Sequence, residues 1–537
     1  MYMKISNKLI SVIFTCAFLA MGMTSCNDLI TEDPKGRLAT QSFFANNNDI
    51  DASINALYSI IASNHAGNYY SGDNFMVGDD ITTHPASNKQ FLREHDQFAT
   101  SSANAWMPAF WGTQWKIIKA ANFIINNVEK TPDVAKEQID VALGQAHFWR
   151  AYSYFYIVTV WGKAPIVLTE DVDYSAPIQS EEEIYKLIVD DLKIAEAKCP
   201  INYTRQPYAR NGINLAVSQG AVKAAMAYVY MAMAGWPLNK GTEYYQLAAS
   251  KAKEVIDGAE NGTYYYRLLP EYKQVFSWEW NDKNPETLLG IYYNKDRTPN
   301  ISSITDVLFD QYQQGWDDVH GEIKFWKDFP DGPRKDVTYF PKIMLSDGNL
   351  YDWWYDTNPP SRQVVAPVFM KNVEGNRGKE FDYTEKFVMD IYGERQHQAI
   401  RLSQVYCWYA EAIGRSGQIN AKAVDLLNKV RNRADGKESN IYNIGMTPEQ
   451  LAEAAYNEHG WETAGFDYAG FANRARDMFR MYRYKDHFEF RKQNPLIEVA
   501  PSIFRKEAVP VEGTWNDSRM YLPYPYSETL LNPNLTK

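Results

Sequence analysis

The residues best suited to chemistry in this chain are aromatic and lie where helical periodicity is absent. Six of its fifteen tryptophans fall within Tyr264–Tyr355: Trp278, Trp280, Trp316, Trp326, Trp353 and Trp354. Turn signals such as Asn284-Pro285 and Asp347-Gly348 interrupt this segment, so its aromatic side chains are predicted to lie on loops and short strands. Aromatic faces suit the C–H face of a pyranose, and neighbouring Asp, Asn and Arg side chains suit its hydroxyls. The segment therefore predicts a carbohydrate-binding surface.

Trp316 is the first candidate ligand-binding residue, because a glycine precedes it and two aspartates follow it. A second loop segment, Ala66–Thr100, adds Tyr70 and Asn74. The remaining candidates are Trp278, Trp280 and Trp353. At about 0.5–1.5 kcal/mol for each aromatic contact, two or three rings give only millimolar-class binding.

The alternative for any of these tryptophans is a place in the core, where most tryptophans of a large domain lie. Trp353 and Trp354 are adjacent, so on a strand they must point to opposite sides. The tryptophans assigned to the core are Trp111, Trp115, Trp149, Trp236 and Trp408.

Motifs for catalysis are missing from the sequence. It contains no His-Glu-x-x-His, Cys-x-x-Cys or Gly-x-Ser-x-Gly, and the glycines of Gly375–Glu380 lack the spacing of a phosphate-binding loop. Asp317, Asp318 and Glu322 could supply the carboxylates of a hydrolase or bind Ca²⁺, but acidic loop residues are usually solvated. The sequence therefore predicts a protein that is not an enzyme and needs no metal or cofactor.

The elements that must position these loops are helices. Ala142–Trp161 has apolar and aromatic residues on every helical face and Arg150 as its only formally charged residue, which predicts a helix buried on most sides. The next helix, Glu181–Lys198, follows Ser180, which with Glu183 forms a predicted capping box.

Further helices are predicted at Ser42–Ser63, Ala105–Val128, Gly220–Gly235, Tyr244–Ile256, Ile400–Gly414 and Ala421–Ala434. In the later pairs, aromatic and small residues alternate at helical spacing, which is typical of tetratricopeptide-like hairpins. The hairpins are unevenly spaced, so large insertions must leave the helical stack. The predicted fold class is mainly α, as a single large domain with a loop-rich mixed α/β remainder.

The N-terminus is predicted to be a lipoprotein signal peptide, residues 1–25. Lys4 and Lys8 precede the apolar run Leu9–Met23, and Met23–Cys26 is similar to a lipobox. Lipid attachment at Cys26 is the favoured interpretation; an ordinary signal peptide and an N-terminal anchor helix are the alternatives. Loss of the two lysines changes the formal net charge from -11 to -13, which argues against binding to nucleic acid.

Two cysteines, Cys199 and Cys407, remain once the signal peptide and Cys26 are set aside. They are too few for a disulfide framework. Both occur in helical patterns, so buried free thiols are favoured over a bridge between them.

Short motifs spread over nearly the whole chain carry a family resemblance. They are Glu32–Gly36 with Phe43-Phe44, Trp149–Tyr152, Trp161–Pro165, Ala234–Leu238, Tyr409–Ala412, Leu427–Ala434, Tyr521–Pro523 and Leu531–Leu535. In this order they resemble the SusD/RagB family of outer-membrane nutrient-uptake lipoproteins. The sequence departs from the family pattern at Asn457–Glu462, at Arg480 and at Tyr524, and the departures are expected to affect internal ion pairs of the C-terminal half.

The resemblance implies about four tetratricopeptide-like helix pairs, no enzymatic activity, and a lipid-anchored position on the outer face of the outer membrane. It also implies a SusC-like TonB-dependent transporter as partner, with an oligosaccharide bound on the loop-rich side. The alternatives are a peptide-binding uptake lipoprotein and an assembly or adhesin component without a soluble ligand. The predicted SusD-like domain spans residues 26–537: an N-terminal helical-repeat half (26–260), a loop-rich insertion (261–399) and a C-terminal half with the last hairpin (400–537).

Overall fold

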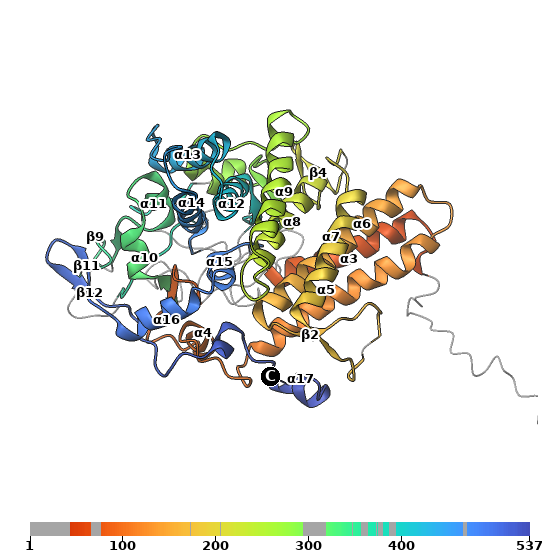
Figure 1. Ribbon diagram of the computed structural model, residues 1–537, viewed down its shortest axis with the longest axis horizontal. Coiled ribbons are helices and arrows are strands. Elements are labelled where there is room, and N and C mark those ends of the chain that lie inside the picture. Colours follow the sequence, from red (N-terminus) through yellow and green to blue (C-terminus); the bar gives the residue numbers. More distant parts are fainter. Residues whose placement is uncertain are drawn as a thin grey trace, which may run out of the picture.

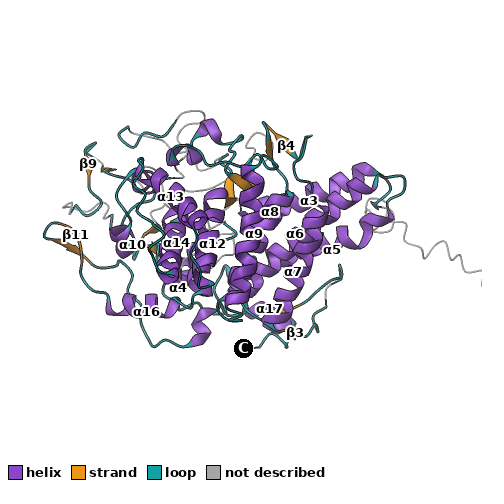
Figure 2. Ribbon diagram, turned by 45° about the horizontal axis from the view of Figure 1, so that its top comes forward, coloured by secondary structure: helices purple, strands orange, loops and turns teal. Residues whose placement is uncertain are grey.

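The computed structural model describes residues 43–65, 77–171, 173–204, 206–293, 318–345, 347–355, 364–371, 373, 380–385, 394–465 and 470–536 (Figure 1). The predicted signal peptide and Cys26 lie outside these residues. The fold is a mainly helical single domain, as predicted: helices form its body, and the strands are short pieces (Figure 2).

The N-terminal half is built on two helix pairs, α3 (Asn47–His65) with α5 (Met107–Asn127) and α6 (Lys136–Val160) with α7 (Glu181–Lys198). The bounds predicted for α7 are correct, and its capping box is present: the Glu183 amide donates to Ser180 Oγ at 3.3 Å. Helix α6 begins at Lys136 rather than at Ala142, because its first turns are polar and partly exposed and so do not show the apolar pattern.

The later helices are α8 (Gln219–Ala234), α9 (Thr242–Glu260), α12 (Leu402–Arg415), α13 (Ala421–Asp435) and α14 (Pro448–Thr463). Helix α8 packs against α9 as predicted, whereas α12 packs more extensively on α14 and α9 than on α13, its predicted partner. The close approach of α12 and α14 depends on Gly414, where a Cβ atom would lie 2.5 Å from the Pro448 carbonyl oxygen.

One aromatic core joins the two halves of the chain. The ring of Phe155 in α6 stacks on Phe471 with centroids 4.7 Å apart, and Tyr228 in α8 lies 5.1 Å from Trp408 in α12. Cys199 and Cys407 are both buried and both free, as favoured by the sequence. Because the N-terminal and C-terminal helices share this core, the helical part folds as a unit.

The rest of the described chain consists of short elements. Between the helix pairs lie β1 (Ile81–Thr83), α4 (Gln90–Asp96), η3 (Val128–Lys130), β2 (Ala164–Pro165), β3 (Ile178–Gln179), β4 (Ala209–Arg210) and β5 (Ile213–Asn214). The loop-rich segment contains η4 (Tyr272–Phe276), η5 (Trp278–Trp280), β6 (Thr287–Ile291), β7 (Val319–Gly321), α10 (Ile323–Asp328), α11 (Pro333–Thr338), β8 (Ile343–Met344), β9 (Leu350–Tyr351) and β10 (His397–Arg401). The C-terminal part adds α15 (Arg474–Arg480), α16 (Tyr484–Gln493), β11 (Ile497–Ala500), β12 (Ile503–Arg505), η9 (Asp517–Met520) and α17 (Tyr526–Leu531).

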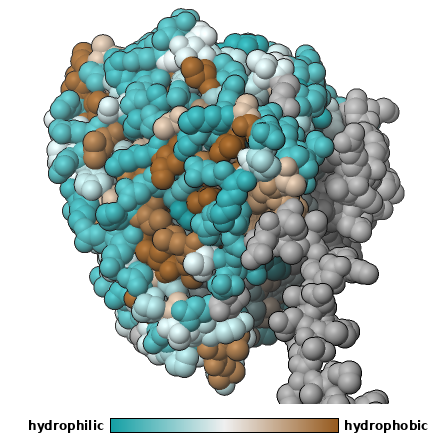
Figure 3. All heavy atoms as spheres, turned by 90° about the vertical axis from the view of Figure 1, so that its right-hand side faces the viewer, coloured by the Kyte–Doolittle hydropathy of each residue, from teal (hydrophilic) through white to brown (hydrophobic). Residues whose placement is uncertain are grey.

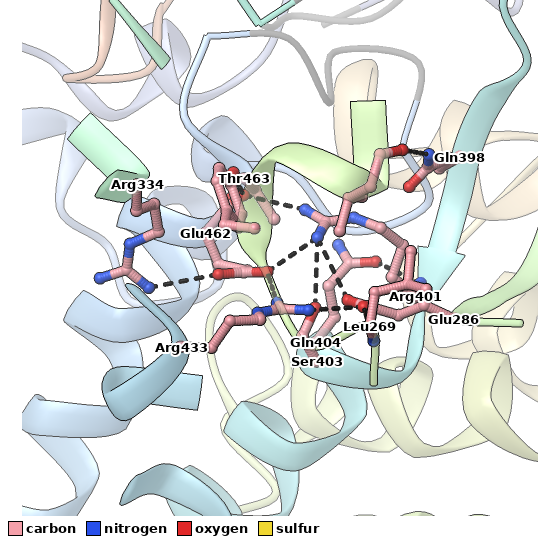
Figure 4. Close-up of polar contacts among 12 residues, drawn as sticks. Leu269, Glu286, Arg334, Gln398, Arg401, Ser403, Gln404, Arg433, Glu462 and Thr463 are labelled. Atoms are coloured by element: carbon pink, nitrogen blue, oxygen red, sulfur yellow. Dashed lines mark hydrogen bonds and ion pairs between the residues drawn. The ribbon is translucent and has the colours of Figure 1, made fainter. Parts of the chain in front are cut away.

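A buried ionic network holds the loop-rich segment on the helices (Figure 4). Glu462 of α14 accepts from Arg401 at 2.8 Å and from Arg334 of α11 at 3.2 Å, and Arg433 of α13 bridges Glu462 and Glu286. All five side chains are at most 7 % exposed. The network therefore ties two residues of the loop-rich segment, Glu286 and Arg334, to the last three long helices.

A second buried network contains Arg480, which pairs with Glu411 of α12 at 2.6 Å and with Asp477 at 2.8 Å. Glu462 and Arg480 are both positions at which the sequence departs from the family pattern, and both take part in internal ion pairs as expected. In the described part of the chain, no helix is both long and apolar enough to cross a membrane.

Candidate functional site

The two loop segments predicted to bind ligand meet in the fold. Strand β1, within Ala66–Thr100, pairs antiparallel with β7, so that Thr83 lies opposite Val319 and Ile81 opposite Gly321. The amide of His84 also donates to the Asp318 carbonyl at 2.9 Å. Segments more than 200 residues apart in sequence are thus joined in one buried two-stranded sheet.

Three predicted ligand-binding residues, Tyr70, Asn74 and Trp316, lie outside the described residues. Ligand contact at each of them stays a prediction. The described residues closest to them in the chain are His65 for Tyr70, Val77 for Asn74 and Asp318 for Trp316.

Of the three acidic residues singled out near Trp316, Asp318 and Glu322 are not solvated, and Asp317 lies outside the described residues. Asp318 is 2 % exposed and accepts a hydrogen bond from Ser87, and Glu322 is fully buried and accepts a hydrogen bond from Arg491. Burial raises the pKa of Glu322 to about 8. Among the described residues, no group of three or more His, Cys, Asp or Glu side chains could hold a metal ion. The sequence could not show this burial, because Arg491 lies far along the chain.

Trp278 and Trp280 lie on the short helix η5 and are both partly exposed. The guanidinium of Arg395 lies 5.4 Å from the centroid of the Trp278 ring, and Lys283 Nζ lies 5.1 Å from that of Trp280. The backbone N–H of Trp278 donates to Glu380 at 3.0 Å. These contacts fix the two rings beside charged groups, an arrangement that suits a polar ligand with one apolar face.

The Trp353 side chain is only 4 % exposed. Its ring packs edge-on against Trp326 and Trp354, with centroids 5.3 and 5.5 Å away. Trp354 is partly exposed, so the adjacent pair does divide between inside and outside. Trp353 supports the cluster from within, and ligand contact at this residue stays a prediction.

Two tyrosines close to this cluster were not singled out from the sequence. Tyr351 at the end of β9 and Tyr355 stack with centroids 4.4 Å apart and an interplanar angle of 25°. Tyr355 is 53 % exposed, and Tyr351 Oη donates to Asp347 at 2.6 Å. We call this pair the tyrosine platform. The four-residue spacing of the tyrosines around Trp353-Trp354 is the signal in the sequence that indicates them.

Of the tryptophans assigned to the core, Trp111, Trp149 and Trp408 are buried, at most 2 % exposed. Trp115 and Trp236 are half-buried, and Trp115 lines a surface hollow. The two His–Asp pairs, His147–Asp191 and His459–Asp477, are buried among helices. The described residues of the loop-rich side offer aromatic faces and hydrogen-bonding groups, and both suit the binding of a ligand.

Comparison with known proteins gives two family matches. A family described as "Starch-binding associating with outer membrane" matches residues 33–231, and the SusD family matches residues 352–537. The chain is 22% identical over 548 residues to SusD-like protein P2 of Formosa agariphila, covering 97% of each chain. It is 24% identical over 577 residues to a SusD-like protein of Bacteroides ovatus, covering 98% of this chain and 97% of the relative.

Solved structures share the fold. A SusD homologue from Bacteroides thetaiotaomicron superposes with a TM-score of 0.73 at 16% identity, covering 93% of this chain and 98% of that one. A SusD-like carbohydrate-binding protein from Bacteroides fragilis gives 0.71 at 17% identity, covering 92% and 100%. A third structure, solved with xylogluco-oligosaccharide, gives 0.68 at 20% identity, covering 91% and 98%.

Proposed function

Because this chain belongs to the SusD/RagB family, whose members are non-catalytic binding proteins associated with the outer membrane, we propose that it captures oligosaccharides at the cell surface. The observation that carries the proposal is the tyrosine platform, a stacked pair in which Tyr355 is exposed and Tyr351 is held by Asp347. A structural relative solved with xylogluco-oligosaccharide supports the same class of ligand.

The proposed binding surface is the loop-rich side of the molecule. It comprises the tyrosine platform, Trp354, and Trp278 with Trp280; Tyr70, Asn74, Trp316 and Trp353 are the further contacts proposed from the sequence. A pyranose stacked on Tyr355 gains about 0.5–1.5 kcal/mol beyond simple burial, so a few such contacts give weak, exchangeable binding. Weak binding suits a protein that passes its ligand on.

The proposed recipient is a SusC-like TonB-dependent transporter in the same membrane, with the binding protein anchored by lipid on Cys26. The lipobox-like Met23–Cys26 supports the anchor. The helical end of the molecule presents patches of hydrophobic residues among hydrophilic ones (Figure 3), and such patches favour contact with another protein.

The test is affinity electrophoresis of the mature chain, from Asn27 onward, through gels that contain single polysaccharides, xyloglucan and starch among them. We expect one class of glycan to retard the protein, and Tyr355→Ala to weaken the interaction two- to tenfold. Tyr526→Ala is the matched control, because Tyr526 is 58 % exposed, like Tyr355, but lies on α17.

Other outcomes would redirect the assignment. If no glycan retards the folded protein, a peptide ligand or an assembly role without soluble ligand replaces the proposal. Degradation of the polysaccharide in the gel would reveal a hydrolase.

A further inference from the structure

The surface hollow that Trp115 lines lies away from the loop-rich side, on the first helix pairs. It has a volume of about 440 Å³, within the range of about 300–1,000 Å³ usual for small-molecule sites. Its lining comes from α5, from the loop after β2 and from the C-terminal segment: Trp111, Trp115, Lys116, Lys119, Val167, Glu170, Asp171, Asp173, Tyr174, Glu528, Asn532 and Leu535 are among the residues. None of these belongs to the proposed binding surface.

The walls of this hollow are fixed by hydrogen bonds. Asn122 of α5 donates to the carbonyls of Val167 at 3.0 Å and Thr169 at 2.8 Å, and its own side-chain oxygen accepts from Arg150 at 2.9 Å. On the other side, Asn532 donates to the Ala176 carbonyl at 3.1 Å. Arg150 is itself held by Asp191. The hollow is therefore formed before any ligand enters, which lowers the entropic cost of binding.

Part of its lining is aromatic: Trp111, Trp115 and Tyr174. The Trp111 and Trp115 rings lie 5.4 Å apart at 57°, and Trp115 is also packed edge-on against Tyr154. Tyr174 is 53 % exposed at the rim. The two contacts to Trp115 hold its ring in place, so a ligand meets a rigid aromatic surface.

The remaining rim is polar and carries charges of both signs: Lys116 and Lys119 face the same hollow as Glu170, Asp171, Asp173 and Glu528. Hydrogen bonds from the Ser175 hydroxyl and amide lower the pKa of Asp173, which stays an acceptor, and burial raises the pKa of the Glu528 carboxyl. Mixed charges do not select an ion. They do suit neutral hydroxyl groups, which accept from ammonium groups and donate to carboxylates.

We infer that this hollow is a second saccharide-binding site, for a short neutral oligosaccharide. The inference rests on the proposed function for the class of ligand, but it concerns different residues. Two sites on separate surfaces would let the protein hold one glycan chain at two points, or retain it while the loop-rich side releases it. Linked contacts of this kind raise the overall affinity without strengthening either one.

Fluorine NMR of the mature chain labelled with 5-fluorotryptophan tests both sites at once. The Trp115 signal is assigned with Trp115→Phe, and those of Trp278 and Trp354 by the same substitution. Xylogluco-oligosaccharide and maltoheptaose serve as probes. We expect one of them to shift the Trp115 signal saturably, with an affinity that Tyr174→Ala lowers two- to tenfold and that Tyr355→Ala leaves unchanged.

The possible results separate the two claims. A shift of the Trp278 or Trp354 signal without any shift of Trp115 overturns the second site and leaves the proposed function standing. A saturable, Tyr174-dependent shift of Trp115 alone supports the second site and counts against the loop-rich site. If a probe moves the Trp115 signal equally in Tyr174→Ala, the hollow is not where it binds, and the inference fails.

Discussion

Neutralising Glu462 should destabilise the fold more than almost any other single change of charge. Its carboxylate is fully buried and is shared by Arg334, Arg401 and Arg433. Burial alone would raise the pKa of Glu462, but the three guanidinium groups hold it well below its usual range. Glu462→Gln leaves these cations in excess in the interior.

Removing one partner from a buried ion pair costs about 3–5 kcal/mol. The entropy of unfolding is about 2.1 cal/mol/K per residue, or roughly 1 kcal/mol/K for this chain of 537 residues. The Tm of Glu462→Gln should therefore fall by about 3–5 °C at pH 7. Differential scanning calorimetry of the mature chain measures the shift.

Glu453→Gln is the control, since Glu453 is 43 % exposed and pairs with Arg483 near the surface. A surface pair contributes about 1 kcal/mol or less, so the Tm of the control should fall by about 1 °C at most.

The lowered pKa of Glu462 also predicts how the effect of the substitution depends on pH. The ionised Glu462 carboxylate contributes its full stability above the unfolded-state pKa of about 4.3, and this contribution is lost as pH falls toward the folded-state pKa. The difference in Tm between the wild type and Glu462→Gln should therefore narrow below about pH 4. A Tm loss no larger than that of the control would refute this account of the network.

Three further predictions concern packing, thiols and pH. Gly414→Ala should lower the free energy of unfolding by about 1–3 kcal/mol, because its Cβ atom would meet the Pro448 carbonyl oxygen at 2.5 Å and push α12 from α14. Chemical denaturation measures the loss. Gly112→Ala is the control, since a Cβ atom there meets nothing within 4 Å. In the mature chain Cys199 and Cys407 are buried and free, and burial raises the pKa of both thiols. A disulfide reagent should therefore react with them only after the protein unfolds. Rapid reaction with the native protein would contradict this prediction. Because burial raises the pKa of Glu322 to about 8, the folded state binds a proton that the unfolded state has released, and stability should fall as pH rises from about 4 to 8. In thermal melts, the Tm of Glu322→Gln should fall less steeply with pH than that of the wild type. An equal dependence of Tm on pH in the two proteins would contradict the raised pKa of Glu322.

The sequence predicts helices best where local signals are strong. The start of α7 follows from Ser180 and Glu183, which act within one turn. The start of α6 was missed because its first turns face solvent and need no apolar pattern. The preference of α12 for α14 over α13 depends on Gly414 meeting a segment more than 30 residues away, which no local pattern reveals.

The candidate site could be located by segment but not by residue. Alternation indicated that Trp353 and Trp354 face different ways, but it could not show which one is buried, because both rings pack against Trp326 and their exposure depends on the fold around them. The tyrosine platform needs the turn after β9, and the partial exposure of Trp115 needs walls from two other parts of the chain. Exposure is a tertiary property, so composition and spacing cannot supply it.

The C-terminal segment packs back on the first helix pairs, and this affects when the chain can finish folding as it is synthesised. The Leu522 amide donates to the carbonyl of Val160 at the end of α6, and Tyr524 Oη donates to the Lys163 carbonyl at 2.6 Å. The N-terminal helices thus gain their last covering only from residues made more than 350 positions later. A nascent chain therefore keeps Trp111, which packs edge-on against Tyr524, incompletely covered until translation is almost finished. This favours a chain that completes folding after release, and a truncation near the C-terminus should disturb residues close to the beginning.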